Sequence, residues 1–189
     1  MSATREATDV ERGRADFDFL IGDWVTEQHR STKPLEEDAP WETFEATIHV
    51  DRLPGGLGNI DYMLAPEWRP GWTGVTLRVF DGETGRWSIF WLAGKTGGVD
   101  SATGNLLTPV VGSFEDGVGT FECDEVFDGT PLRTRYRWTC VDDDNVTWEQ
   151  SFSFDQGATW KANWKMTGRR LAIDSGDRPA PPAEPWQPS

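Results

Sequence analysis

The feature that most constrains the fold is a regular series of short segments in which apolar and polar residues alternate. The runs that separate them, among them DGETG, DGTP, DDDN and DQGA, are rich in the residues that tight turns require. Tryptophan favours strands and the chain has 11, while its 20 Gly and 12 Pro supply turns. The pattern predicts an all-β domain of about ten strands.

No connection between these segments is long enough for a crossover helix, so neighbouring strands are expected to be antiparallel and to form a meander. A flat meander would leave two unpaired edges, and closure into a barrel removes them. The predicted strands lie near residues 24–31, 41–52, 58–64, 72–80, 86–93, 106–114, 119–127, 132–140, 146–154 and 160–168.

Four successive segments in the second half predict which face of the sheet meets water. Their charged faces are acidic, basic, acidic and basic in turn, and opposite charges across a strand pair are mutually stabilising. These faces carry Glu122 and Asp124, then Arg133, Arg135 and Arg137, then Glu149, then Lys161 and Lys165 with Asn163. The other faces, which are expected to point inward, carry Phe121, Cys123, Phe127, Leu132, Tyr136, Trp138, Cys140, Trp148, Gln150, Phe152, Phe154, Trp160, Ala162, Trp164 and Met166.

The two ends of the chain differ from this pattern. Residues 1–14 are charged and aperiodic and predict a frayed arm, and the Pro-rich residues 171–189 predict an extended tail. A single β-barrel domain is therefore expected over residues 15–170. In ADFDFLIGDW, Phe17, Leu20 and Ile21 have helical spacing before Gly22, which predicts one short N-terminal helix that plugs the barrel.

Composition excludes several classes of partner. The formal net charge of −14 works against nucleic acids and anionic membranes, because both are bound through Lys and Arg. The sequence has no signal-peptide core and no run of about 18 apolar residues, so a cytoplasmic location is expected, with Cys123 and Cys140 reduced. No Cys/His cluster has metal-ligand spacing, so no metal is expected. A homodimer is left open.

Five blocks of sequence carry a family resemblance: DFDFLIGDW, LPGGLGNID, LRVFD with RWSIFW, PVVGSFEDGVGTF, and WEQSFSFDQGATWKANW. Their order resembles the DUF1579 family of uncharacterised bacterial proteins, over roughly residues 15–167. That family is similar to the calycin group of ligand-holding β-barrels, which includes lipocalins, fatty-acid-binding proteins and nitrobindins. The resemblance implies a calycin-like barrel and no catalytic residue. Nitrobindins hold haem through a C-terminal histidine, and no histidine follows His49, so no cofactor is expected.

Inward polar groups beside aromatic rings are the best site candidates, because an apolar pocket needs a few convergent polar groups to orient a ligand. His49 also shares a strand face with Glu45, which would suit proton transfer, although a hydrogen-bonded or exposed strand histidine is the alternative. The candidate ligand-binding residues are Trp91, Glu125, Tyr136, Trp138, Trp148, Gln150, Trp164, His49 and Glu45.

Three functions fit these residues. The first is a module that binds one small apolar or aromatic molecule inside an aromatic-lined barrel. The second is an enzyme on the same barrel, of isomerase, cyclase or hydrolase type, that uses His49, Glu45 or Glu125 in proton transfer. The third is a structural or interaction protein whose barrel is filled.

Two further motifs are interpreted as structural. The run SFDQGATW, residues 153–160, fits the Asp-box of sialidase propellers, but one box lacks the blades and arginine cluster of a sialidase. It is expected to form a hairpin with Asp155 accepting backbone N–H bonds and Gly157 at positive φ. The run PGGLGNID, residues 54–61, is expected to pass close to another element, and its Asp61 could reach a cavity.

Overall fold

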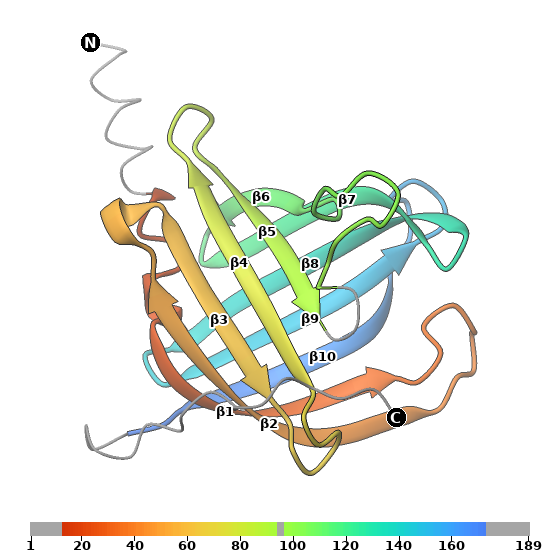
Figure 1. Cartoon of the computed structure of the whole chain (residues 1–189), viewed down its shortest axis with the longest axis horizontal. Helices are drawn as coiled ribbons and strands as arrows, with labels where there is room; N and C mark the ends of the chain where they lie inside the picture. The colour runs from red at the N-terminus through yellow and green to blue at the C-terminus, as the bar shows by residue number, and fades with distance from the viewer. Residues whose placement is uncertain (1–12, 94–96, 173–189) are drawn as a thin grey trace.

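The computed structural model describes residues 13–93 and 97–172, and these form a closed barrel of ten antiparallel strands (Figure 1). Consecutive strands pair with each other, and β1 also pairs with β10, which closes the barrel. The predicted closed meander is confirmed. The elements are η1 (Asp18–Leu20), β1 (Gly22–Ser31), β2 (Trp41–Arg52), η2 (Pro54–Gly56), β3 (Gly58–Leu64), β4 (Thr73–Asp81), β5 (Arg86–Ala93), β6 (Val110–Glu115), β7 (Val118–Phe127), β8 (Thr130–Asp142), β9 (Asn145–Ser153) and β10 (Lys161–Arg170).

The largest difference from the predicted strands lies between β5 and β6. A strand was expected over residues 106–114, but β6 begins only at Val110, and an isolated bridge joins Val99 to Leu106 before it. Pro109 has no N–H to donate to a ladder, which explains the late start of the strand. Apart from residues 13, 14, 171 and 172, the predicted arm and tail lie outside the described residues.

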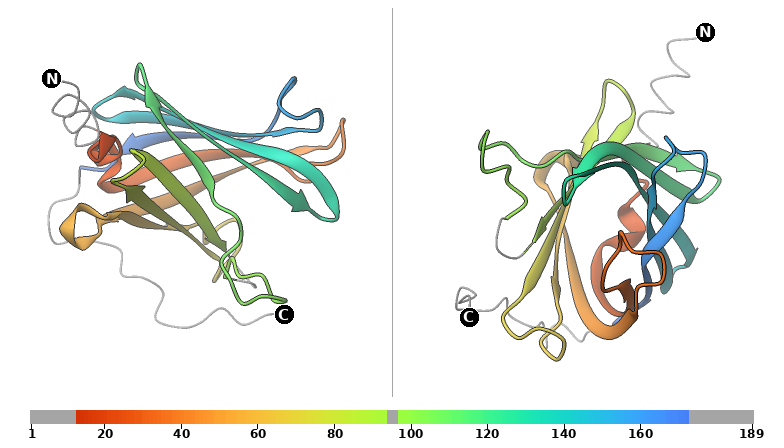
Figure 2. Two further views of the ribbon diagram at one scale, coloured as in Figure 1. Left: turned by 90° about the horizontal axis from the view of Figure 1, so that it is seen from above. Right: turned by 90° about the vertical axis from the view of Figure 1, so that its right-hand side faces the viewer.

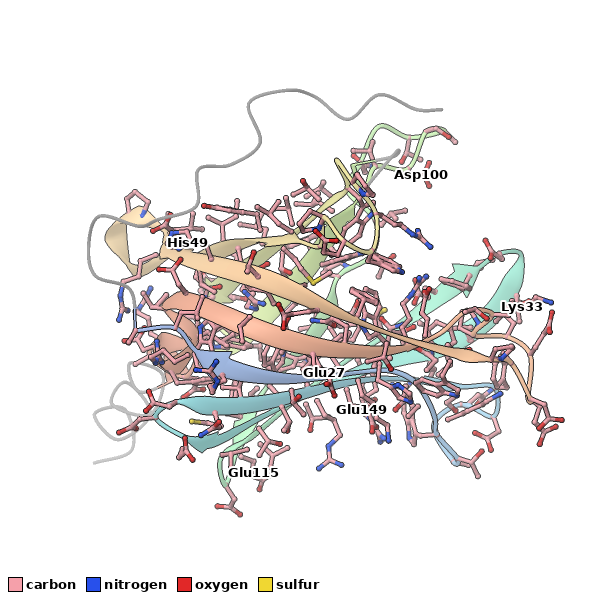
Figure 3. The ribbon with its side chains drawn as sticks, turned by 90° about the horizontal axis from the view of Figure 1, so that it is seen from below. Glu27, Lys33, His49, Asp100, Glu115 and Glu149 are labelled. Atoms are coloured by element: carbon pink, nitrogen blue, oxygen red, sulfur yellow. The ribbon has the colours of Figure 1, made fainter. Side chains whose placement is uncertain are left out.

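The two faces of β7, β8, β9 and of β10 from Trp164 onward lie as predicted. On the outer face, Arg133 of β8 contacts Glu122 at 3.1 Å and Asp124 at 3.0 Å, and Lys165 of β10 lies 3.7 Å from Glu149 of β9, which Figure 3 labels. The inward faces of the same strands supply much of the core. The buried apolar residues there are Phe121, Leu132, Trp138, Val146, Phe152 and Met166.

A β-bulge in β10 changes the predicted facing of the residues before it. The register with β9 shifts between Ala162 and Trp164, so that Asn163 is the extra residue. Asn163 is buried, and Trp160 lies outside, with the guanidinium carbon of Arg135 4.1 Å from the centre of its ring. The expectation that Trp160 and Ala162 face inward and Asn163 outward is wrong, because one inserted residue reverses the alternation on its far side.

Phe154 is a fourth residue whose predicted facing is wrong. It lies beyond the last residue of β9, and its side chain is 53% exposed. The strand ends because residues 153–159 form a turn.

One end of the barrel is plugged by the N-terminal segment, which Figure 2 shows at that end. The predicted short helix is present as the 3-10 helix η1. Phe17, just before it, is only 1% exposed and meets Trp87 and Phe114 edge-on, with ring centres 5.0 and 4.9 Å away. Trp24 Nε1 donates to the Leu20 carbonyl at 2.8 Å, which ties η1 to β1.

The β3–β4 connection covers the inner face of β2 at the other end. Trp68 stacks on Phe44 with ring centres 3.9 Å apart, and its Nε1 donates to Glu42 Oε2 at 3.0 Å. Trp72 lies next to Trp68, with ring centres 5.3 Å apart. The connection therefore narrows the end of the barrel that is opposite η1.

The Asp-box forms the turn between β9 and β10. Asp155 accepts hydrogen bonds from Thr159 N at 2.8 Å and Thr159 Oγ1 at 2.6 Å, and from Ser153 Oγ at 2.8 Å. These bonds lower the pKa of Asp155 to about 2. Gly157 has φ +95°, as its position in the motif required. The motif is a structural turn, as predicted.

The glycine-rich run that leads into β3 also behaves as predicted. Gly58 has φ +144°, and a Cβ there would lie 1.9 Å from the Arg78 carbonyl oxygen. Only glycine allows β3 to start this close to β4.

Candidate functional site

Two adjoining cavities occupy the barrel interior. The inner chamber, of about 60 Å³, lies toward β3 and β4, and the outer chamber, of about 240 Å³, lies toward the turns at the ends of β1 and β7. The chambers share five lining residues and so lie side by side. The shared residues are Ile89, Trp91, Tyr136, Gln150 and Trp164.

Aromatic side chains from four strands form the walls. Trp164 meets Trp91 and Trp148 edge-on, with ring centres 5.9 and 5.7 Å away, and Trp148 meets Tyr136 at 5.1 Å. Trp138 lines the inner chamber. Alternation along β5, β8, β9 and β10 turns all five rings to the same side of the sheet. The structure thus brings together the predicted aromatic residues of the site.

The two predicted polar residues of β7 and β9 also reach the chambers. Gln150 lines both, and its Nε2 donates to Asn163 Oδ1 at 2.8 Å. Glu125 lines the outer chamber and accepts a hydrogen bond from Thr134 Oγ1. Burial raises the pKa of Tyr136, and the nearby Glu125 raises it further. Tyr136 is therefore a neutral hydrogen-bonding group at ordinary pH.

Cys123 is a thiol in the outer chamber. Its burial, with Glu125 and Asp124 nearby, raises its pKa to about 12. The thiolate is the reactive form of cysteine, so this residue is inert as a nucleophile.

An ion pair at the inner chamber was missed by the sequence analysis. Arg78 Nη2 lies 2.6 Å from Asp61 Oδ2, and Arg78 Nη1 donates to Asn59 Oδ1 at 2.8 Å. All three residues are buried, and Asp61 does line a cavity, as its motif allowed. The sequence does contain a signal for this pair: Arg78 is the one arginine of β4, and its charge is opposite to that of Asp61 on the neighbouring strand β3.

Gln28 was also missed. It is 1% exposed on the inner face of β1, where Trp164 Nε1 donates to its Oε1 at 2.8 Å and its Nε2 donates to Thr26 Oγ1 at 2.9 Å. A single glutamine in an alternating strand carries no sequence signal that separates it from an outward one.

The predicted residues Glu45 and His49 lie elsewhere. Both are on the outer face of β2, opposite Phe44 and the other inward residues, and neither lines the chambers (Figure 3 labels His49). Their placement in the ligand site is therefore corrected: alternation along β2 puts Phe44, Ala46 and Ile48 inside instead.

His49 is held by carboxylates rather than open to a substrate. Its Nδ1 lies 2.5 Å from Asp23 Oδ1, and its Nε2 lies 3.1 Å from Asp51 Oδ2 without hydrogen-bond geometry. Glu45 is exposed and pairs across the strands with Glu27. The hydrogen-bonded strand histidine, which was the alternative interpretation, describes His49 best.

Within residues 13–93 and 97–172, no group of three or more His, Cys, Asp or Glu side chains is arranged to hold a metal ion. The same part of the chain contains no helix of the length and apolar character needed to span a bilayer.

Fold and site together define a closed antiparallel β-barrel with an aromatic cavity. No protein-family model matches the chain, and no curated protein matches it. Among solved structures, the chain is similar to a protein of unknown function of the DUF3598 family from Nostoc punctiforme, with 14% identity and a TM-score of 0.49. The match covers 82% of this chain but only 49% of that one, so the chain spans about half its length.

Proposed function

We propose that this protein binds one small apolar or aromatic molecule in the two chambers. The observation that carries the proposal is the lining of two adjoining chambers by Trp91, Tyr136, Trp138, Trp148 and Trp164, with polar groups confined to a few positions. Such a lining is typical of sites that hold an apolar ligand and orient it through a few hydrogen bonds.

Chamber size limits the ligand. Pockets for drug-sized molecules have volumes of about 300–1,000 Å³, and the outer chamber, at about 240 Å³, is smaller. A molecule with one or two rings suits this space. Leu107 lines the outer chamber and is 49% exposed, so the ligand has a route from the surface there.

The enzyme alternative depends on a carboxylate or histidine in the cavity. Glu125 meets that condition, whereas Glu45 and His49 do not line either chamber. No histidine among the described residues lines the chambers, so no Glu–His pair in them supports the alternative. The filled-barrel alternative predicts that no compound binds.

Three further expectations from the sequence, on partners, location and family, belong to the same proposal. The charge of −14 supports a protein without nucleic-acid or anionic-membrane partners. A cytoplasmic location is a separate part of the proposal. Membership of the DUF1579 family, within the calycin group, is proposed from the sequence blocks described above. The closed meander is the fold which that membership implies.

Tryptophan-fluorescence titration tests the binding proposal. The panel contains lipids, haem, flavins and aromatic compounds of one and two rings. Trp148→Ala is compared with Trp41→Ala, whose ring lies on the outer face of β2 and is 39% exposed. We expect Trp148→Ala to weaken binding at least about tenfold, because burying an aromatic side chain contributes about 1.5–3 kcal/mol. Trp41→Ala should bind like the wild type.

Circular dichroism and thermal melting show whether both variants fold. If no class of compound quenches the wild-type protein, or if Trp41→Ala weakens binding as much as Trp148→Ala, the chambers are not the binding site.

A further inference from the structure

The chambers contain buried hydrogen-bond donors without partners. Arg78 Nε, Trp138 Nε1 and Asn163 Nδ2 have no acceptor within the described part of the chain, although the three residues are only 2%, 6% and 2% exposed. A buried polar group without a partner is costly, so such groups mark places where a ligand supplies the missing bond. All three are donors. The complementary ligand therefore carries acceptors.

Two of these donors belong to the inner chamber. Asp61 and Asn59 engage the two Nη atoms of Arg78, which leaves its Nε–H. The guanidinium carbon of Arg78 lies 5.2 Å from the centre of the Trp138 ring, and both residues line this chamber. A carbonyl oxygen has two lone pairs, so one such oxygen can accept from both N–H groups.

The third donor belongs to the outer chamber. Asn163 is the bulge residue of β10, and its Oδ1 accepts from Gln150 Nε2 at 2.8 Å. This bond fixes the amide and leaves Nδ2 as the free end, in a residue that lines the outer chamber. The site thus offers donors in both chambers, with the aromatic walls between them.

Charge in the chambers is balanced. Asp61 neutralises Arg78 in the inner chamber, and the two charged residues that line the outer one, Arg30 and Glu125, carry opposite charges. An anionic ligand would meet Asp61 and Glu125, and a cationic one would meet Arg78 and Arg30. A neutral ligand avoids both conflicts.

We infer that the ligand is a neutral aromatic carbonyl compound. Its carbonyl oxygen accepts from Arg78 Nε and Trp138 Nε1, its ring lies against Trp91, Trp148 and Trp164, and a second acceptor, where present, meets Asn163 Nδ2. This inference rests on the proposed binding function and names the class of molecule bound.

Equilibrium dialysis with four matched naphthalene derivatives tests the inference. The probes are 2-acetonaphthone, its isostere 2-isopropenylnaphthalene, in which CH₂ replaces the carbonyl oxygen, the anion 2-naphthoate, and the cation 1-(2-naphthyl)ethylammonium. We expect the ketone to bind at least about tenfold more tightly than the other three, because only it is both neutral and an acceptor.

Trp138→Phe removes one donor and keeps an aromatic ring, and Trp148→Phe is the matched control in the same chamber. We expect Trp138→Phe to bring the ketone-to-alkene affinity ratio down toward one. In Trp148→Phe both affinities should fall together, so that the ratio is kept.

The results separate the inference from the function on which it rests. Equal binding of ketone and alkene, tighter binding of an ionic probe, or an equal change of the ratio in both variants would overturn the carbonyl assignment while leaving the binding function intact. If none of the four probes binds and no compound of the fluorescence panel binds either, both the carbonyl assignment and the binding function are overturned.

Discussion

The two sides of the barrel differ in the kind of residue that points inward. In β7–β10 most apolar residues point inward, and the paired charges Glu122, Asp124, Arg133, Glu149 and Lys165 point outward to water. In β3 and β4 the inward positions hold Asn59, Asp61 and Arg78, whereas the outward ones include the exposed Ile60. Polarity alone therefore does not assign a face. A buried charge is tolerated where a partner and hydrogen bonds neutralise it.

Breaking the buried pair gives the largest expected effect. Asp61→Asn removes the charge that neutralises Arg78 and leaves a buried guanidinium, which should cost about 3–5 kcal/mol of unfolding free energy. Urea denaturation measures it. Replacing both residues, as Asp61→Leu with Arg78→Met, should recover most of that loss. A loss below about 1 kcal/mol for Asp61→Asn would mean that Arg78 is solvated and that the two sides of the barrel do not differ in this way.

The second-largest loss of unfolding free energy is expected at Phe17, the residue of the N-terminal plug that contacts both sides of the barrel. Phe17 packs on Phe121 of β7, with ring centres 5.5 Å apart, and lies 5.3 Å from the guanidinium carbon of Arg78. Phe17→Ala should lower the unfolding free energy by about 3 kcal/mol or more, through lost burial and the cavity it leaves. Phe154→Ala, at a 53% exposed ring, is the control and should change little. Similar losses in both variants would contradict the assignment of Phe17 to the core.

Removing the ion pairs on the outer face of β7 and β8 should cost far less unfolding free energy than breaking the buried Asp61–Arg78 pair. Arg133→Ala removes contacts to Glu122 and Asp124 that water and salt screen, so a loss of about 0.2–1 kcal/mol is expected. Denaturation at low and high salt should show the loss shrinking as ionic strength rises. A salt-independent loss of several kcal/mol would place this pair in the same class as Asp61–Arg78.

The smallest effect is expected at the Asp-box turn, and it depends on pH. Hydrogen bonds from Thr159 and Ser153 lower the pKa of Asp155 from 3.8 to about 2. The stabilisation is therefore fully present above about pH 4 and is lost as the pH falls toward 2. Asp155→Asn should thus melt below the wild type at pH 6, and the gap should narrow between pH 4 and 2. A gap that stays constant over this range would show that the carboxylate charge does not matter.

Much of the architecture could be predicted from local patterns. Alternation and turn clusters located the ten strands, and the charge pattern of residues 122–165 assigned the faces of β7, β8 and β9. These signals are short-range, because successive residues of a strand point to opposite faces of the sheet. The same reasoning placed Trp91, Tyr136, Trp138, Trp148, Trp164, Gln150 and Glu125 in the cavity.

The failures have a different origin. The facing of Trp160, Ala162 and Asn163 depends on a bulge whose presence is fixed by pairing with β9. Glu45 and His49 were site candidates because they share a strand face, but the pairing of β2 with β1 and β3 puts that face outside. Alternation shows which residues share a face, but in a strand with polar residues on both faces, such as β2, only the partner strands decide which face is inside.

The sequence by itself determined an all-β chain, its strand order as a meander, and a set of aromatic residues on common faces. Only the tertiary structure decided that Arg78 and Asp61 meet inside the barrel, and that Trp138 and Asn163 present donors without partners to one cavity. The physical reason is that strand periodicity is local, whereas ion pairing, burial and cavity shape arise from residues that closure of the barrel brings together.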